Sequence, residues 1–143
     1  RYMTEHRTQR AIPLADHESQ PYWDAAAQHI LKLPYCESCK RFRFPPRPTC
    51  PVCLDFQLIW MEISGQGTLY SFAVMHDSYV TGFQPPFLIA QIELVEQPGL
   101  RLTTNLVDCT STEAGIGMPV SVIFEQRGED VTVPQFRPVR QAN

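Results

Sequence analysis

Two cysteine pairs constrain this chain more than any other feature of its sequence. Each pair has the spacing C-x2-C, and residues 40–49 separate the pairs; the cysteines are Cys36, Cys39, Cys50 and Cys53. A tight turn inside each pair directs both sulfurs toward one point, so that four thiolates can surround a tetrahedral metal ion. Two disulfides are the alternative, but they need an oxidising compartment, which nothing else in the sequence suggests. We therefore predict a four-cysteine metal site.

The segment between the two pairs predicts a compact ribbon. Basic and aromatic side chains alternate from Arg41 to Phe44, and the prolines Pro45, Pro46 and Pro48 follow. This pattern indicates a short strand and a stiff return, as in a zinc ribbon. No redox motif lies beside it, which favours zinc over iron. Four thiolates leave no open coordination position, so we expect a structural role for the site.

Length and composition set limits on the class of protein. The 143 residues fit one or two small modules, and the 43% hydrophobic content is enough for a packed core. A formal net charge of −3 argues against a general nucleic-acid binder and against an anionic-membrane binder. No apolar run approaches the roughly 20 residues that a membrane span needs. The start carries no secretory signal pattern, so we expect a cytoplasmic protein.

A short helix is predicted ahead of the first cysteine pair, after a polar arm at residues 1–20. Ser19 suits the N-cap, Pro21 is tolerated in the first turn, and Asp24 complements the positive helix end. Apolar residues follow at i, i+3, i+4 and i+7, namely Trp23, Ala26, Ala27 and Ile30. This stripe either fills a core or docks on a partner, and the sequence does not separate the two roles.

Beyond Cys53 the apolar pattern has a period of two, which predicts strands. After an earlier strand at 30–35, the expected strands are 58–64, 68–75, 87–95, 100–107, 120–125 and 131–137, with a long loop over 76–86. Short strands at this spacing predict a small closed barrel, and the five-stranded OB-fold fits best because it tolerates long loops. The predicted fold is mainly β, with an N-terminal helix. Its parts are a polar arm at 1–20, the helix and a rubredoxin-like zinc ribbon at 21–56, an OB-fold at 57–138 and a tail at 139–143.

Several motifs together resemble one protein family. They are the helix with Trp23, then YCESCKRFRFPPRPTCPVC, SGQGTLYSFAVMH, IGMPVSVIF and the ending VPQFRPV. Over roughly residues 20–138 the chain resembles the zinc-ribbon plus OB-fold proteins that accompany acyl-CoA enzymes. The resemblance implies a non-catalytic subunit or domain that binds and stabilises a thiolase-like enzyme and helps to accommodate the acyl-CoA. The implied partner is a thiolase or a lipid-transfer-type aldolase that shortens steroid side chains.

The residues themselves offer no convincing nucleophile or acid/base pair. Cys109 follows Val107 and Asp108 at a predicted strand end, where a lone cysteine is usually a small, inert residue. His76 and Asp77 are neighbours in sequence, but this adjacency does not orient an imidazole as a catalytic dyad requires. We therefore assign no catalytic residue and expect the partner to supply the chemistry.

The basic run between the cysteine pairs is a candidate binding surface. Arginine presents a planar fork of donors suited to phosphate oxygens, and coenzyme A carries a 3′-phosphate and a pyrophosphate. Arg41, Arg43 and Arg47 are therefore candidate CoA-binding residues. In the simpler interpretation these arginines form a solvated face, while Phe42 and Phe44 pack the ribbon against its neighbour.

The sequence also predicts the residues that contact the partner, and it leaves two alternative functions open. The expected contacts with the partner enzyme come from Trp23, Ile30, Phe42 and Phe44. The competing hypothesis is a single-stranded nucleic-acid-binding module, since zinc ribbons and OB-folds both bind single strands. The acidic balance and the lack of a basic groove across the barrel strands argue against it. The third hypothesis is a free-standing structural or regulatory zinc protein.

Overall fold

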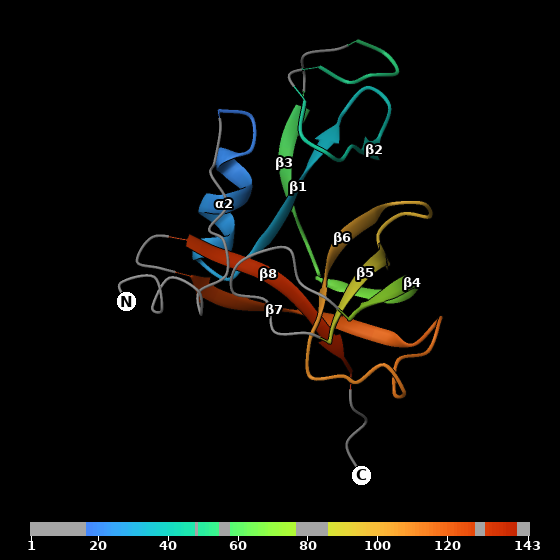
Figure 1. Ribbon diagram of the computed structural model, residues 1–143. Coiled ribbons are helices and arrows are strands. Elements are labelled where there is room, and N and C mark those ends of the chain that lie inside the picture. Colours follow the sequence, from blue (N-terminus) through green and yellow to red (C-terminus); the bar gives the residue numbers. More distant parts are fainter. Residues whose placement is uncertain (1–16, 48, 55–57, 77–85, 128–130, 140–143) are drawn as a thin grey trace.

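The computed structural model describes residues 17–47, 49–54, 58–76, 86–127 and 131–139. One short helix, a three-stranded sheet and a closed five-stranded barrel make up this part of the chain (Figure 1). The predicted mainly β class, with an N-terminal helix, a cysteine ribbon and a five-stranded barrel, is therefore confirmed. Most of the predicted arm at 1–20 and of the loop at 76–86 lies outside the described residues. None of the described helices has the length and apolar character needed to cross a membrane.

Helix α2 (Gln20–Ala27) is shorter than its apolar pattern suggested. Ser19 is the N-cap residue by position, but its side chain makes no capping hydrogen bond. Asp24 lies beyond the first turn and accepts a 2.7 Å hydrogen bond from the Gln20 side chain, so its predicted role at the helix N-terminus is wrong. The helix ends after Ala27, because the backbone turns through a left-handed conformation at His29 (φ 61°).

The buried face of α2 also differs from the predicted stripe. Ala25 and Ala26 are buried, whereas Ala27 is exposed and Ile30 lies past the helix end. Tyr22, one turn before this pair, packs against the core, and burial raises its pKa to about 12. The face that contacts the protein is therefore rotated by about one residue from the predicted one.

The ribbon sheet contains three antiparallel strands in the order β2-β1-β3. These are β1 (Leu31–Cys36), β2 (Arg41–Phe42) and β3 (Leu58–Ile63). β3 falls within the range 57–138 that was predicted for the OB-fold, yet it pairs with β1 along its whole length, from Leu31 opposite Ile63 to Cys36 opposite Leu58. The ribbon is thus anchored by a strand that follows the second cysteine pair.

The barrel is formed by the last five strands in the order β4-β5-β6-β8-β7, and pairing of β4 with β7 closes it. They are β4 (Gln66–Met75), β5 (Phe87–Leu94), β6 (Arg101–Leu106), β7 (Pro119–Arg127) and β8 (Val131–Pro138). The β6–β8 contact is parallel, and the other pairings are antiparallel. Gly67 permits the close approach of β4 to β5, since a Cβ there would lie 2.6 Å from the Glu93 carbonyl oxygen.

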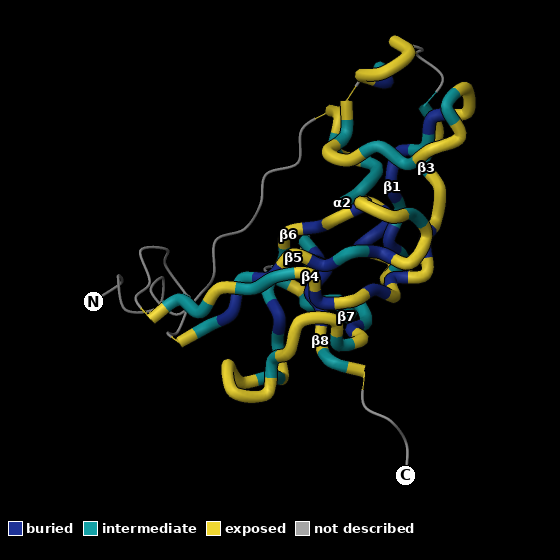
Figure 2. The backbone as a smooth tube through the Cα atoms, turned by 90° about the vertical axis from the view of Figure 1, so that its right-hand side faces the viewer, coloured by how far each residue is buried: buried dark blue, intermediate teal, exposed yellow. Residues whose placement is uncertain are grey.

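Ribbon and barrel share one hydrophobic core. Leu31 and Leu33 of β1 belong to the same buried cluster as Leu69, Ile92 and other barrel residues. The buried segments run through the barrel and along β1 (Figure 2). The position of the cysteine ribbon is therefore tied to the barrel by packing as well as by the chain connection.

Candidate metal centre

The two cysteine pairs sit on matching turns. In the first, the Lys40 N–H donates to the Cys36 carbonyl at 2.7 Å; in the second, the Leu54 N–H donates to the Cys50 carbonyl at 2.8 Å. Both donor residues have a left-handed backbone, with φ of 58° and 62°. The first turn also points the Cys39 N–H at the Cys36 sulfur, at 3.4 Å. Two similar turns thus present their sulfurs toward each other.

The four predicted ligands come together. Their Sγ atoms lie within 4.8 Å of one another, and across the pairs Cys36 is 3.5 Å from Cys53 and Cys39 is 3.8 Å from Cys50. A disulfide needs a sulfur–sulfur distance of about 2.05 Å, and none of these four cysteines is disulfide-bonded. Four thiolates held about 2.3 Å from one zinc ion in a tetrahedron lie roughly 3.8 Å apart. The spacing therefore fits a tetrahedral metal ion, and the disulfide alternative is wrong for this arrangement.

The surroundings of Cys50 favour its thiolate form. The backbone N–H of Cys53 makes the largest contribution, and with help from the Arg43 side chain it lowers the pKa of the Cys50 thiol to about 6. The Arg43 Nε–H donates to the Cys50 sulfur at 3.3 Å, and this bond is the main cause of the raised pKa of Arg43. Metals bind thiolates rather than thiols, so this environment prepares Cys50 as a ligand.

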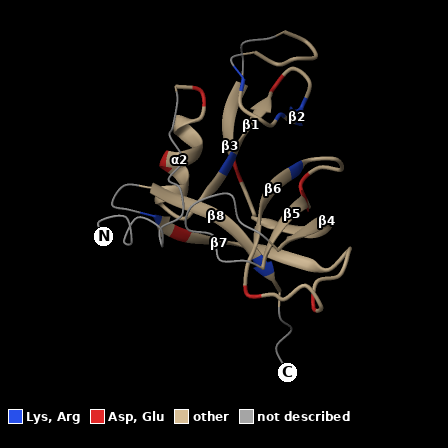
Figure 3. Cartoon of the chain, in the orientation of Figure 1, with Lys and Arg blue, Asp and Glu red and all other residues tan. Residues whose placement is uncertain are grey.

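The predicted arginines line one groove between the ribbon and the barrel. Its volume is about 580 Å³, and Arg41, Arg43 and Arg47 line its ribbon side. Arg101, at the start of β6, lines the barrel side, so the groove has basic residues from both modules in its lining. Figure 3 shows basic segments on both β2 and β6. Arg101 stacks 3.6 Å from the centre of the Tyr70 ring and pairs with Glu93 at 3.2 Å. Arg101 was not predicted from the sequence, since only the docking of the ribbon on the barrel brings it to this groove.

The turn between β5 and β6 holds the ribbon side of this groove in place. The Gln97 side-chain oxygen accepts from the Phe42 N–H at 2.8 Å, and its amide nitrogen donates to the Phe42 carbonyl at 3.3 Å. The neighbouring Glu96 carboxylate accepts from the Ser64 N–H at 2.8 Å. Gln97 thus continues the hydrogen bonding of β2 onto the barrel, a contact that no local sequence pattern indicates.

The predicted partner-interface residues lie at several places around the ribbon. Trp23 packs edge-on against Tyr22, with ring centres 5.0 Å apart, and Phe44 lies 5.9 Å from the same tyrosine. Phe44 is 37% exposed. Phe42 instead packs against Tyr35 and the core. Trp23 and Phe44 are therefore joined through Tyr22, while Phe42 already has packing contacts within the chain.

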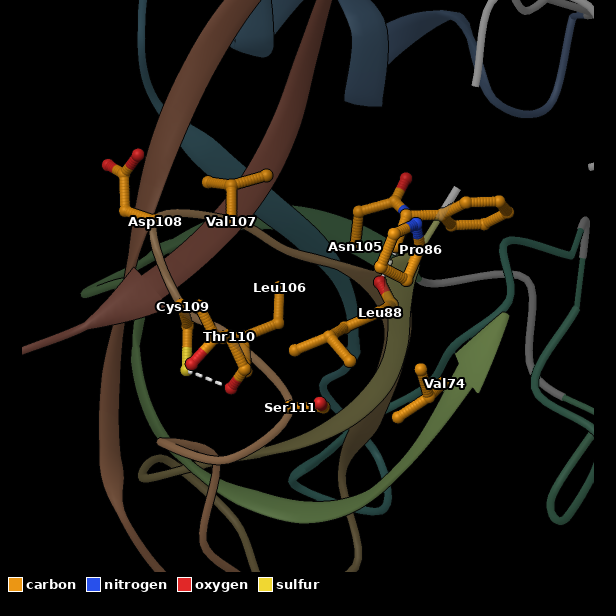
Figure 4. Close-up of a pocket in the computed structure, with 11 residues that line it drawn as sticks. Val74, Pro86, Leu88, Asn105, Leu106, Val107, Asp108, Cys109, Thr110 and Ser111 are labelled. Atoms are coloured by element: carbon orange, nitrogen blue, oxygen red, sulfur yellow. Dashed lines mark hydrogen bonds between the residues drawn. The ribbon is translucent and has the colours of Figure 1, made fainter. Parts of the chain in front are cut away.

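A second cavity, of about 340 Å³, opens where β4 ends and β5 begins (Figure 4). Val74, Leu88 and Leu106 give it an apolar lining, with Asp108 and Cys109 at its edge. The Cys109 thiol donates to the Thr110 carbonyl at 3.4 Å. The described lining contains no histidine that could activate this thiol, and Asp77, the neighbour of His76, lies outside the described residues. The described lining therefore offers no histidine-activated cysteine.

Two family profiles match the chain. Residues 23–58 match a profile described as the rubredoxin-like zinc ribbon domain of ChsH2. Residues 60–125 match a profile described as the C-terminal OB-fold domain of ChsH2. The boundary between these matches lies at the start of β3.

The curated relatives of this chain differ in length and in name. The chain is 36% identical over 129 residues to a "Probable enoyl-CoA hydratase alpha subunit" of Thermomonospora curvata, covering 90% of this chain and 40% of that protein. It is 38% identical over 100 residues to a "DUF35 domain-containing scaffold protein" of Methanocaldococcus jannaschii, covering 66% of this chain and 67% of that one. The chain thus spans less than half of the hydratase subunit and about two thirds of the scaffold protein.

A solved structure named "Ltp2-ChsH2(DUF35) aldolase" contains a chain of the same fold. The superposition has a TM-score of 0.81 at 36% sequence identity, and it covers 88% of this chain and 98% of that one. Because the superposition covers 88% of this chain, the similarity includes both the ribbon and the barrel.

Proposed function

Because this chain belongs to the ChsH2 (DUF35) family of zinc-ribbon and OB-fold proteins, we propose that it is a zinc-binding, non-catalytic partner of a thiolase-like acyl-CoA enzyme. The observation that carries the proposal is the likeness to the ChsH2(DUF35) chain of the Ltp2 aldolase, at a TM-score of 0.81 over 98% of that chain. A chain that matches nearly the whole length of an aldolase component fits the same kind of assembly. The partner is a lipid-transfer-type aldolase or a thiolase.

Zinc is the metal that the donor set fits best. Four cysteine thiolates at tetrahedral spacing are a common structural zinc site, and such a site leaves no position for substrate or water. Cys36, Cys39, Cys50 and Cys53 would hold the ion. The ion would stabilise the ribbon, and the partner would supply the reacting groups.

The ribbon and its helix provide the proposed contact with the partner. The rings of Trp23 and Phe44 both contact the ring of Tyr22. Phe44 is partly exposed, as are Ile59 and Met61 of β3. Aromatic residues that combine partial exposure with fixed packing are frequent anchors in protein interfaces. Ile30, the remaining residue of the predicted interface set, is half-buried beyond the helix end.

The test of the partner role is co-expression with a candidate aldolase or thiolase. We expect the two chains to purify as one complex, and we expect carbon–carbon bond cleavage or formation on acyl-CoA to require both. The control is each chain expressed alone and assayed at the same concentration. Turnover of acyl-CoA by this chain unaided, or a partner that is equally soluble and active without it, would reject the proposal.

A hydratase partner is the second candidate. The relative from Thermomonospora curvata is named a hydratase alpha subunit, and the matched region makes up 40% of it. Repeating the co-expression with a candidate hydratase subunit separates the two candidates. A complex that hydrates an enoyl-CoA without cleaving a carbon–carbon bond would favour the hydratase.

The basic groove is the proposed site for the phosphates of the acyl-CoA. Arg41 and Arg47 are exposed on its ribbon side, and Arg101 adds a third guanidinium from the barrel. Arg43, the third arginine predicted from the sequence, is half-buried and directed at the Cys50 sulfur, whereas Arg101 is exposed and pairs with Glu93 only through its Nε. We therefore place the CoA contacts at Arg41, Arg47 and Arg101.

Removing a groove arginine should weaken acyl-CoA use by the assembled complex. A hydrogen bond to a charged group contributes roughly 1.5–3 kcal/mol, so Arg47→Ala should raise the KM for acyl-CoA about tenfold or more. Arg137→Ala removes an exposed arginine that does not line this groove and serves as the matched control. Steady-state kinetics of the purified complex provide the measurement. Unchanged KM values for Arg41→Ala, Arg47→Ala and Arg101→Ala would leave these arginines as a solvated face.

A further inference from the structure

Zinc bound by four cysteines would place a net negative charge inside this fold. Four thiolates and one divalent ion have a net charge of about −2. The Cys36 and Cys50 side chains are fully buried, so part of this charge lies away from solvent. A buried charge is costly unless an opposite charge or hydrogen-bond donors compensate it. The ribbon therefore needs positive charge beside the sulfurs.

Arg43 lies where this compensation is needed. It follows β2 directly, and its backbone N–H donates to the Pro34 carbonyl of β1 at 2.8 Å, which fixes its position beside the cluster. Its Nε–H donates to the Cys50 sulfur at 3.3 Å. The guanidinium is also close enough to Cys39 to interact with that thiol, and the two sulfurs lie 3.8 Å apart. One cation therefore acts on one cysteine from each pair.

The neighbouring arginines of the ribbon differ from Arg43 in their surroundings. Arg41 and Arg47 are exposed, whereas Arg43 is half-buried. Exposed charges are screened by water and contribute little to a nearby ion. Of the three ribbon arginines, Arg43 thus contacts the Cys50 sulfur, whereas Arg41 and Arg47 are exposed at the groove.

We propose that Arg43 is a positioning residue of the metal centre, which compensates the negative charge of the zinc–thiolate cluster and orients Cys50 through its Nε–H. This inference rests on the proposed zinc occupancy and goes beyond the partner role. It also removes Arg43 from the set of arginines assigned to coenzyme A. Residues that hydrogen-bond to metal ligands commonly change metal affinity by roughly 10–100-fold when they are replaced.

The experiment measures the zinc dissociation constant of the isolated full chain by competition with a chromogenic chelator. We expect Arg43→Gln to weaken zinc binding by roughly 10–100-fold. Arg43→Lys should fall between this variant and the wild type, since it keeps the charge but loses the planar Nε–H. Arg41→Gln removes the same charge from the same hairpin and should keep the wild-type constant. Circular dichroism of the zinc-loaded proteins checks that each variant is folded.

The outcomes separate this inference from the proposed function. If Arg43→Gln binds zinc within twofold of the wild type, or if Arg41→Gln weakens binding equally, the assignment is wrong. Should Arg43→Gln fail to fold, the comparison of Arg43→Lys with Arg41→Gln decides the question in the same way. If the variants show the predicted differences in zinc affinity but the chain binds no thiolase-like partner, the role assigned to Arg43 is supported and the partner role is rejected.

Discussion

Replacing Cys50 by serine should remove the metal and unfold the cysteine ribbon rather than slow a chemical step. Cys50 is fully buried, receives the Arg43 hydrogen bond and lies 3.8 Å from Cys39, so its loss opens the centre of the cluster. Structural zinc binding contributes roughly 10–16 kcal/mol to small zinc-binding peptides. This exceeds what the two-residue strand β2 and its turns can recover from other contacts. We expect one zinc per wild-type chain and a large loss of zinc in the variant.

Hydrogen exchange of the backbone amides should show which part of the fold opens when the metal is lost. Without metal, the amides of Cys39, Lys40 and Phe42 should lose their protection, since their hydrogen bonds belong to the ribbon turns and to the Gln97 contact. The amides of β5 and β6 should keep more of theirs, because those strands pair within the barrel. Leu31 and Leu33 pack in the shared core, so some loss of barrel stability should follow as well.

Cys109→Ser is the matched control for Cys50→Ser. It makes the same chemical change at a cysteine outside the cluster, whose thiol contacts the Thr110 carbonyl. It should retain one zinc per chain and a protected ribbon. A Cys50→Ser chain that still binds zinc with wild-type affinity would contradict a four-thiolate site. Iron found in place of zinc in freshly purified protein would correct the identity of the metal while leaving the ligands unchanged.

The strands and the metal ligands were predictable because their signals are local. Alternating side chains mark strand faces within a few residues, and C-x2-C spacing brings two sulfurs together within one turn. The predicted strand at 87–95, for example, differs from β5 (Phe87–Leu94) by one residue at its end. Neither signal depends on how distant parts of the chain meet.

The remaining features depend on contacts between distant segments. The pairing of β3 with β1 cannot be read from either strand, because nothing local to Leu58–Ile63 shows whether it pairs with the ribbon or with the barrel. Arg101 reaches the groove, and Gln97 reaches Phe42, only after the β5–β6 turn docks on the ribbon. The buried face of α2 was misjudged because its end is set by the turn at His29 and not by the apolar stripe.

Phe136 illustrates such a distant contact, and its truncation should cost the barrel much of its stability. Its side chain is fully buried and is the largest of the fully buried set. It lies on β8 opposite Leu106, at the parallel contact between β6 and β8, and its carbonyl accepts the Val107 N–H at 2.8 Å. Phe136→Ala keeps this backbone bond and leaves a cavity in the core beside the strand contact.

The expected loss for Phe136→Ala is about 3–5 kcal/mol of unfolding free energy, as for other buried phenylalanines. Small domains have only about 5–15 kcal/mol in total, so the variant should lie near the limit of folding at room temperature. Val95→Ala, at a side chain that is 63% exposed, should change the same free energy by no more than about 0.5 kcal/mol. Urea unfolding of the zinc-loaded proteins, followed by tryptophan fluorescence and circular dichroism, measures both. A well-packed core is sensitive to the removal of a large side chain. A loss below about 1 kcal/mol for Phe136→Ala would therefore contradict the prediction and would mean that the barrel closes without this side chain.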